Sequence, residues 1–348
     1  MTGWPLRIAA TLAIAFFALT FVNAGWLAPD PKGSVKFIAH RGLYQIYDHT
    51  GVGRDDCTAT RIEQPNHGYL ENTVPSIKRA AKLGAYYVEV DIAPTRDKEI
   101  AIFHDRSVDC RTDGSGDTRD LTMAQLKALD AGHGYTADDG KSFPFRGKGV
   151  GAIPTIEEAL AAAGRARLLY KFKSNDPKEA ELLAAALKAA GRDVGQRGDA
   201  FYGEQATVDR IHELAPDAWA FSNEEASRCS RDYLAMGWSG HVPESCRGKT
   251  IFVPLDYQWA FWGWPNRMIA RMEQYDTRIV VIGAQDEGDP TGLSLPEELG
   301  EIPASFNGYV WVDDSFAVIP ALITRFDDRS QAEFEALQAS LERRRARY

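Results

Sequence analysis

The chain has 348 residues with 40 basic and 49 acidic side chains, which gives a formal net charge of −9 at pH 7. Its hydrophobic share of 44% and charged share of 26% are ordinary for a globular protein. These values exclude a disordered chain, a collagen, a disulfide mini-protein and a multi-span membrane protein. The acidic balance disfavours nucleic acid as a partner, because binding to a phosphate backbone requires a basic face. The length fits one large α/β barrel or two ordinary domains.

An apolar segment near the N-terminus predicts export. Residues 8–22, which follow Arg7, carry no charge and number about 15, which suits a signal-peptide core and is short for a membrane span. Small side chains at Val22 and Ala24 stand where signal peptidase reads, so cleavage would make Gly25 the first residue.

The alternative is an uncleaved anchor. Trp4 and Trp26 flank the apolar run as interfacial aromatic residues do, and extension to Leu27 gives about enough length for a thin bilayer. We therefore expect residues 1–27 to be a signal peptide or a membrane anchor. The protein is then periplasmic, or anchored with its domain facing the periplasm or the extracellular side.

Export makes the four cysteines informative, because disulfides form in oxidising compartments. Three pairings are possible. Cys229 and Cys246 bracket a turn-rich segment, whereas Cys57 and Cys110 lie in irregular stretches that we place on one face of the fold. We predict the pairs Cys57–Cys110 and Cys229–Cys246.

Strand patterns alternate with helix patterns along the chain, which predicts a parallel sheet. Nine runs rich in β-branched and aromatic residues are candidate strands, one more than a TIM (β/α)8 barrel needs: 35–39, 86–92, 100–103, 168–172, 200–202, 219–221, 251–253, 279–282 and 309–312. Amphipathic helices are expected between many of them: 74–83, 122–129, 156–163, 177–190 and 207–214. Without a linker or repeat to divide the chain, we expect a single barrel over residues 28–348.

Polar residues follow several of these strands. His40 and Arg41 end the first run, and His104 ends the third. In a TIM barrel, catalytic residues gather at the carboxyl ends of the strands. Histidines on different strands suit an acid and a base on opposite sides of a reacting group.

Charged pairs lie in the second and fourth runs. Glu89 and Asp91 are two residues apart, so both point to one face and suit a hard divalent cation. Lys171 and Lys173 share a face in the same way and, with Arg41, suit an anionic phosphoryl group. This set predicts metal-assisted cleavage of a phosphodiester.

The order of these residues resembles the glycerophosphodiester phosphodiesterase family. The resemblance rests on His40-Arg41-Gly42, Glu71-Asn72-Thr73, Gly84-Ala85 through Glu89-Val90-Asp91, His104-Asp105 and Ile153 through Glu158, with Trp311-Val312-Asp313-Asp314 as a degenerate last-strand motif. It implies a TIM barrel of the PLC-like phosphodiesterase type that binds Ca²⁺ or Mg²⁺ and releases glycerol phosphate from an esterified alcohol.

The resemblance also implies roles for single residues. His40 and His104 match the acid–base pair, and Arg41 matches a phosphate ligand. The implied metal ligands are Glu89, Asp91 and Glu71, while Lys173 matches the strand-four lysine that contacts phosphate.

Two departures from the family pattern stand out. Lys171 occupies the position of an expected glutamate ligand, so either the metal is held by the remaining carboxylates and water, or Lys171 replaces the metal's charge. An ammonium there would repel a divalent cation. The second departure is a long insertion at residues 43–70, which we expect to rim the pocket.

Two aromatic or basic segments have open interpretations. The run from Trp259 to Trp264 is predicted to pack in the core, wall an apolar leaving-group pocket, or dip into a membrane. Residues 331–348 predict a C-terminal helix with a solvated, arginine-rich end, of which Arg347 is part; contact with anionic lipid is the alternative.

Three functions remain in view. The first is an exported, metal-assisted phosphodiesterase acting on small-molecule glycerophosphodiesters or on lysophospholipids, with possible membrane association. The second is a metal-independent, phospholipase-like enzyme that forms a cyclic phosphate. The third is an inactive relative that binds phosphate esters.

Overall fold

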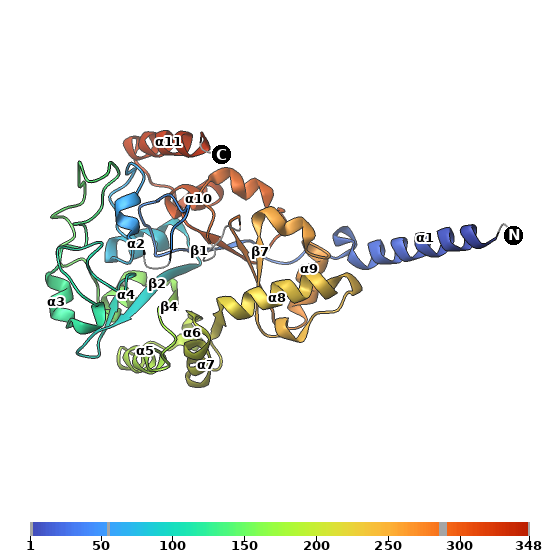
Figure 1. Ribbon diagram of the computed structural model, residues 1–348, viewed down its shortest axis with the longest axis horizontal. Helices are drawn as coiled ribbons and strands as arrows, with labels where there is room; N and C mark the ends of the chain where they lie inside the picture. Colours follow the sequence, from blue (N-terminus) through green and yellow to red (C-terminus); the bar gives the residue numbers. More distant parts are fainter. Residues whose placement is uncertain (1–2, 54–55, 285–290, 347–348) are drawn as a thin grey trace.

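A curved, almost closed sheet of eight parallel strands forms the centre of the molecule (Figure 1). The computed structural model describes residues 3–53, 56–284 and 291–346. The eight strands follow the order β6-β5-β4-β2-β1-β9-β8-β7. Their bounds are β1 Lys36–Ala39, β2 Tyr87–Pro94, β4 Arg167–Phe172, β5 Ala200–Gly203, β6 Trp219–Ser222, β7 Thr250–Pro254, β8 Arg278–Ile282 and β9 Tyr309–Val312.

The predicted barrel is therefore confirmed, and the surplus ninth strand has a clear place. β3 (Ile100–Ile102) pairs antiparallel with the far end of β2, so it forms a hairpin rather than a barrel strand. β6 and β7 are the first and last strands of this order, where the barrel is not closed by backbone pairing in the described chain. Across this gap, the indole Nε1 of Trp219 on β6 donates a 2.9 Å hydrogen bond to Thr250 Oγ1 on β7.

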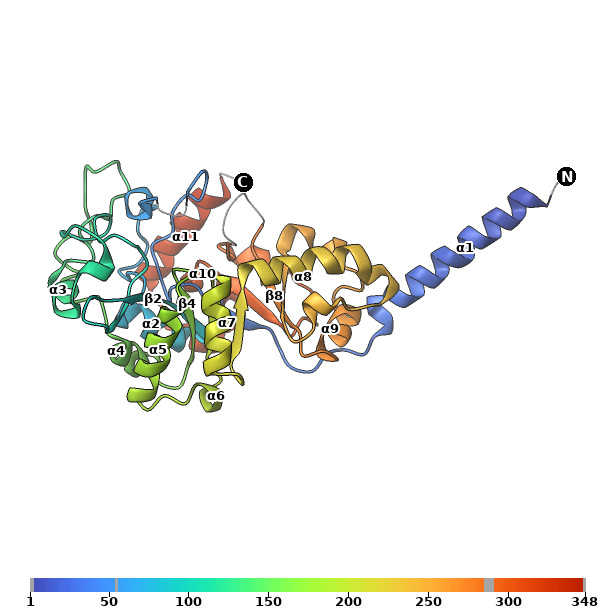
Figure 2. The same ribbon diagram turned by 60° about the horizontal axis from the view of Figure 1, so that its bottom comes forward.

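The described α-helices surround the sheet, apart from α1, which projects away from the domain (Figures 1 and 2). They are α1 Trp4–Asn23, α2 Val74–Leu83, α3 Met123–Ala128, α4 Ile156–Ala163, α5 Lys178–Ala189, α6 Val194–Arg197, α7 Gln205–Leu214, α8 Asn223–Met236, α9 Asn266–Glu273, α10 Ser315–Leu322 and α11 Gln331–Arg345. Thr73 caps α2 as expected, and Gly84 ends it in the left-handed conformation that favours glycine.

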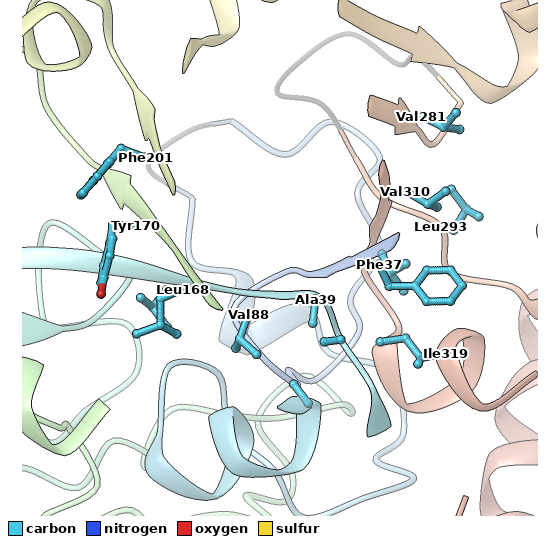
Figure 3. Close-up of a cluster of buried hydrophobic side chains, with 14 of the residues drawn as sticks. Phe37, Ala39, Val88, Leu168, Tyr170, Phe201, Val281, Leu293, Val310 and Ile319 are labelled. Carbon is cyan, nitrogen blue, oxygen red and sulfur yellow. The ribbon is translucent and has the colours of Figure 1, made fainter. Parts of the chain in front are cut away.

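Apolar side chains alternate between two layers. Phe37, Ala39 and Val310 point outward, where Ile319 of α10 and other helix residues cover them (Figure 3). Ile38 and Trp311 point into the barrel, where aromatic rings from several strands fill the interior. This period-two alternation is the expected consequence of a sheet buried on both faces.

The two predicted disulfides are both present. Cys57–Cys110 joins the insertion to the segment after β3, and Cys229–Cys246 joins α8 to the segment before β7. The C-terminal helix is present as α11, but its basic end is not wholly solvated. Arg344 is buried and contacts Glu63 in the insertion and Asp314 after β9, whereas Arg347 lies outside the described residues.

The aromatic run before α9 belongs mainly to the core. Phe261 is buried, the Trp262 indole donates to Leu234 O at 2.8 Å, and the Trp264 indole donates to Gln258 Oε1 at 2.9 Å. Trp259 alone in this run is strongly exposed.

Replacing both Cys229 and Cys246 with serine should lower the free energy of unfolding by about 3 kcal/mol, because the open chain gains the conformational entropy of a loop of 17 residues. Urea unfolding of the oxidised protein and the double variant measures this difference. Coincident unfolding curves would contradict the prediction.

Candidate active site

Side-chain alternation decides which polar residues face the barrel interior. Ile38 and Trp311 point inward, so His40 and Asp313, each two residues further along, turn inward as well. The same period brings four further polar side chains to the inner face of β2 and β4: Glu89, Asp91, Lys171 and Lys173. All of these positions lie at or near the carboxyl ends of the strands.

His40 is paired with a carboxylate of the last strand. The register places Ala39 opposite Val312, so His40 and Asp313 follow side by side. His40 Nδ1 lies 2.7 Å from Asp313 Oδ1. Burial alone would raise the pKa of the Asp313 carboxyl, but the hydrogen bond and charge of His40 lower it to about 2. Asp313 therefore fixes the ring and leaves Nε2 for chemistry in the barrel mouth.

His104 reaches the same mouth by a route that differs from the predicted one. It does not end a barrel strand; the β2–β3 hairpin turns the chain back, and Phe103 N donates to Asp91 O at 3.0 Å. His104 Nδ1 lies 2.6 Å from Asp105 Oδ1. Burial, reinforced by the charge of Arg41, lowers the pKa of His104 well below its ordinary value. Its imidazole is therefore neutral at pH 7.

Glu89 is held by two donors. The backbone N–H of Arg41 donates to Glu89 Oε2 at 2.6 Å, and the Tyr202 hydroxyl donates to Oε1 at 2.6 Å. Arg41 has a φ of 52°, an uncommon conformation for a residue other than glycine, and this turn aims its N–H at the carboxylate. Burial and the charge of Glu89 raise the pKa of Tyr202 well above its ordinary value, so its hydroxyl keeps the proton that it donates.

Glu71 is held mainly by an arginine that sequence reasoning did not select. Arg111 lies 2.7 Å from Glu71 Oε1 and, through its Nε, 2.7 Å from Asp105 Oδ2. The Tyr135 hydroxyl donates to Glu71 Oε2 at 2.7 Å, and Arg41 lies 3.5 Å away. Arg111 thus links the carboxylate partner of His104 to Glu71.

Asp91 faces the cations of the mouth. Lys173 Nζ lies 3.4 Å from Asp91 Oδ1, and the Asn72 amide donates to Oδ2 at 2.8 Å. Although burial opposes ionisation, Lys173, Lys171 and Arg41 hold the pKa of Asp91 well below its usual range. Burial lowers the pKa of Lys173 to about 8, and Asp91 offsets part of that effect.

Lys171 has a different environment. Its Nζ lies 5.4 Å from the centre of the Tyr202 ring, as in a cation–π contact. Within the described chain, Lys171 forms no ion pair with a carboxylate inside 4.0 Å. Its charge is therefore available to an anion in the cavity.

A cavity of about 470 Å³ opens over this arrangement. Its walls include both histidines, the cations and residues of the insertion: His40, Arg41, Tyr47, His49, Val52, Gly53, Asp56, Thr58, His104, Lys171, Phe172, Lys173, Tyr202, Gly203, Glu204, Asn223, Phe252, Thr291, Trp311 and Asp313. The insertion thus lines one side of the cavity, as expected. Within the described part of the chain, the Trp259–Trp264 run contributes nothing to these walls.

The sequence model of the "Glycerophosphoryl diester phosphodiesterase family" matches residues 48–229, which is just over half of the chain. The chain belongs to this family. The match begins after His40 and Arg41. The assignment of the first-strand motif is therefore supported by the sequence pattern and the structure, and not by this match.

Curated relatives agree. The glycerophosphodiester phosphodiesterase of Bacillus subtilis is 33% identical over 162 residues, which cover 43% of this chain and 54% of the relative. Glycerophosphodiester phosphodiesterase 1 of Mus musculus is 36% identical over 135 residues, which cover 39% of this chain and 38% of that relative. The aligned region thus spans about half of the curated relatives or less.

Solved structures of similar fold include the glycerophosphoryl diester phosphodiesterase domain of a Mycobacterium tuberculosis protein, with a TM-score of 0.57 and 17% identity over 81% of this chain and 97% of that one. The glycerophosphodiester phosphodiesterase of Agrobacterium tumefaciens has a TM-score of 0.53 and 19% identity, covering 83% and 99%. At this level of identity the comparison supports the barrel fold.

The residues of this family member do not fit the divalent cation that the resemblance implies. No three His, Cys, Asp or Glu side chains converge as a metal site in the described residues. Glu71, Glu89 and Asp91 each bind donors of the protein instead, and Lys171 stands at the expected ligand position. The assignment of Glu71, Glu89 and Asp91 as metal ligands therefore stays a prediction, which this arrangement does not favour because donors of the protein already engage all three carboxylates.

Three residues of the mouth escaped sequence reasoning as functional candidates. Asp313 lies in the degenerate last-strand motif. Its role depends on its contact with His40, which the sequence does not show. Arg111 directly follows Cys110 of a predicted disulfide, and its Nη2 donates to Thr58 Oγ1 at 2.7 Å. Tyr202 occupies an inward position of β5, which the alternation pattern marks once the register is known.

Addition of Ca²⁺ or Mg²⁺ should leave the melting temperature of the wild-type protein unchanged. A Lys171→Glu variant, which restores the family's acidic residue, should instead gain stability with Ca²⁺, by about 2.7 kcal/mol at a concentration 100-fold above the dissociation constant. Lys171→Gln is the matched control, because it removes the charge without adding a ligand. Metal-dependent melting of the wild type, measured by scanning calorimetry, would overturn this interpretation.

Proposed function

We propose that this family member is a phosphodiesterase that hydrolyses glycerophosphodiesters to an alcohol and glycerol phosphate. The observation that carries the proposal is one cavity whose walls include His40 and His104, each with a carboxylate on its Nδ1, together with three cations. Relatives named glycerophosphodiester phosphodiesterase support the substrate class. A similar fold from Oleispira antarctica, with a TM-score of 0.50 and 18% identity over 85% of this chain and 98% of that one, is a complex with the product sn-glycerol-3-phosphate.

The phosphate is bound by Arg41, Lys171 and Lys173. These side chains surround the cavity from β1 and β4 and balance the charge that develops on the non-bridging oxygens in the transition state. Lys171 has no carboxylate partner among the described residues. It supplies the positive charge that a divalent ion provides in metal-assisted phosphodiester cleavage. No step of this mechanism passes through a metal.

Proton transfer is shared by the two histidines. His104, neutral at pH 7, accepts the proton of the attacking hydroxyl at its Nε2 while that oxygen forms a bond to phosphorus. The bond from phosphorus to the leaving alcohol breaks, and His40 Nε2 donates the proton that this alcohol takes up. The Asp313 carboxylate stabilises His40 while it carries that proton.

The nucleophile is water or the neighbouring hydroxyl of the substrate's own glycerol. The second choice gives a cyclic phosphate, as the metal-independent alternative requires. Phosphorus NMR of the products of glycerophosphocholine separates these routes, because a five-membered cyclic phosphate resonates far from glycerol phosphate.

We also propose export of the protein, supported by its two disulfides and its apolar N-terminal helix. The proposed substrate is a small-molecule glycerophosphodiester. Lysophospholipids are the second candidate, and several apolar walls of the cavity, among them Val52, Phe172 and Phe252, favour a leaving group with some apolar surface.

Replacing His40 or His104 with alanine should lower the turnover of glycerophosphocholine by about 10²–10⁴-fold, because each variant lacks one proton-transfer group. His212→Ala on the exposed side of α7 is the control and should retain full activity. EDTA should not inhibit the wild type. Absence of turnover by the wild type on any phosphodiester would identify a binding protein instead.

The value of kcat/KM should fall above about pH 8, where Lys173 loses the proton that it needs to bind phosphate. The sign follows from burial, which favours the neutral amine and so lowers the pKa of this lysine. A Lys173→Arg variant should move the alkaline limb to higher pH. An alkaline limb identical in both proteins would exclude Lys173 as its source.

A further inference from the structure

We propose that α1 stays in the mature protein as a membrane anchor, instead of being removed as a signal peptide. The inference rests on the export proposed above. At the base of α1, residues of the predicted cleavage site are part of the folded domain.

A buried arginine ties α1 to the barrel. Arg271 of α9 is only 7% exposed, and its Nη2 donates to Val22 O at 2.9 Å. Its Nη1 donates to Asn23 Oδ1 and to Gly237 O, each at 3.1 Å. Among the described residues, Arg271 has no carboxylate within ion-pair distance.

The charge of Arg271 is thus stabilised by the carboxyl ends of two helices. Val22 lies in the last turn of α1, and Gly237 is the cap that follows α8. Unpaired carbonyls at a helix end attract a cation. Removal of α1 would take two of these hydrogen-bond acceptors, Val22 O and Asn23 Oδ1, from the guanidinium.

The peptide bond that signal peptidase would cut is enclosed in the same contacts. Ala24 is buried, and the backbone at Gly25 approaches so closely that an added Cβ would lie 2.9 Å from Trp264 O. The Asn23 amide also donates to Trp238 O at 2.7 Å. A protease needs this bond exposed and extended, so folding of the barrel protects it.

The rest of α1 fits a lipid bilayer. Its 20 residues span about 30 Å, the thickness of the hydrocarbon core, with a mean hydropathy of 1.9 and none of that apolar stretch buried by the protein. Trp26 and Trp238 are 79% and 51% exposed at the base, where interfacial aromatic residues belong. Figures 1 and 2 show α1 projecting alone from the α8–α9 side of the domain.

The full chain, expressed in a Gram-negative bacterium with its own signal peptidase, tests the proposal. Fractionation with a carbonate wash, followed by intact-mass measurement, should find the chain in the membrane with the residues before Gly25 still attached. A soluble periplasmic chain that begins at Gly25 would overturn retention and leave export standing. An intact chain in the cytosol would overturn both.

An Arg271→Met variant tests the Arg271 clasp, which is the set of hydrogen bonds from Arg271 to Val22, Asn23 and Gly237. The fraction of chain that begins at Gly25 should be several-fold larger than in the wild type. Without the clasp, the peptide bond between Ala24 and Gly25 stays accessible to signal peptidase for longer. Arg210→Met, at a partly exposed arginine on α7 far from α1 in sequence, is the control and should match the wild type. Equal fractions for Arg271→Met and wild type would show that the clasp does not protect the bond.

Discussion

The mouth of this barrel depends on one constraint, which is that charges removed from water must be paired. Arg111 meets it by bridging Glu71 and Asp105, and Lys173 by facing Asp91. These pairs set the orientation of Glu71, of Asp91 on β2 and of Asp105, the carboxylate behind His104. Loss of one partner would leave a buried charge uncompensated, so the network is rigid for electrostatic reasons.

The same constraint determines which charges the cavity presents to a ligand. Donors of the protein engage Glu71, Glu89 and Asp91. The charge offered to a ligand therefore comes from the cations that line the cavity, which are Arg41, Lys171 and Lys173. The protein as a whole is acidic, with a net charge of −9, yet its cavity presents cations. Local pairing, not overall charge, therefore determines which ions bind.

Sequence reasoning succeeded where a local period decides the structure. The barrel strands, their inward polar residues, the Thr73 cap and both disulfides follow from alternation, spacing and turn chemistry. It failed where a long-range register decides. That Asp313 meets His40, and that Arg344 is buried between Glu63 and Asp314, both depend on segments distant in sequence. The pairing of Ile100–Ile102 with β2 is local, but its short apolar run has the same pattern as a barrel strand. The metal assignment stays a prediction, because the sequence lists the carboxylates but not the donors that engage them in the fold.

Helix α8 joins the cavity of the proposed active site to the base of α1. It begins at Asn223, which lines the cavity, and ends beside the Arg271 clasp at the base of α1; both views show it running toward α1. Its 14 residues make it a spacer of about 20 Å. With α1 retained in a bilayer as proposed, α8 lies between the membrane anchor and the proposed phosphate site. In that arrangement the proposed substrate would be met outside the bilayer, and a diester still embedded in the leaflet would have to leave it to be cleaved.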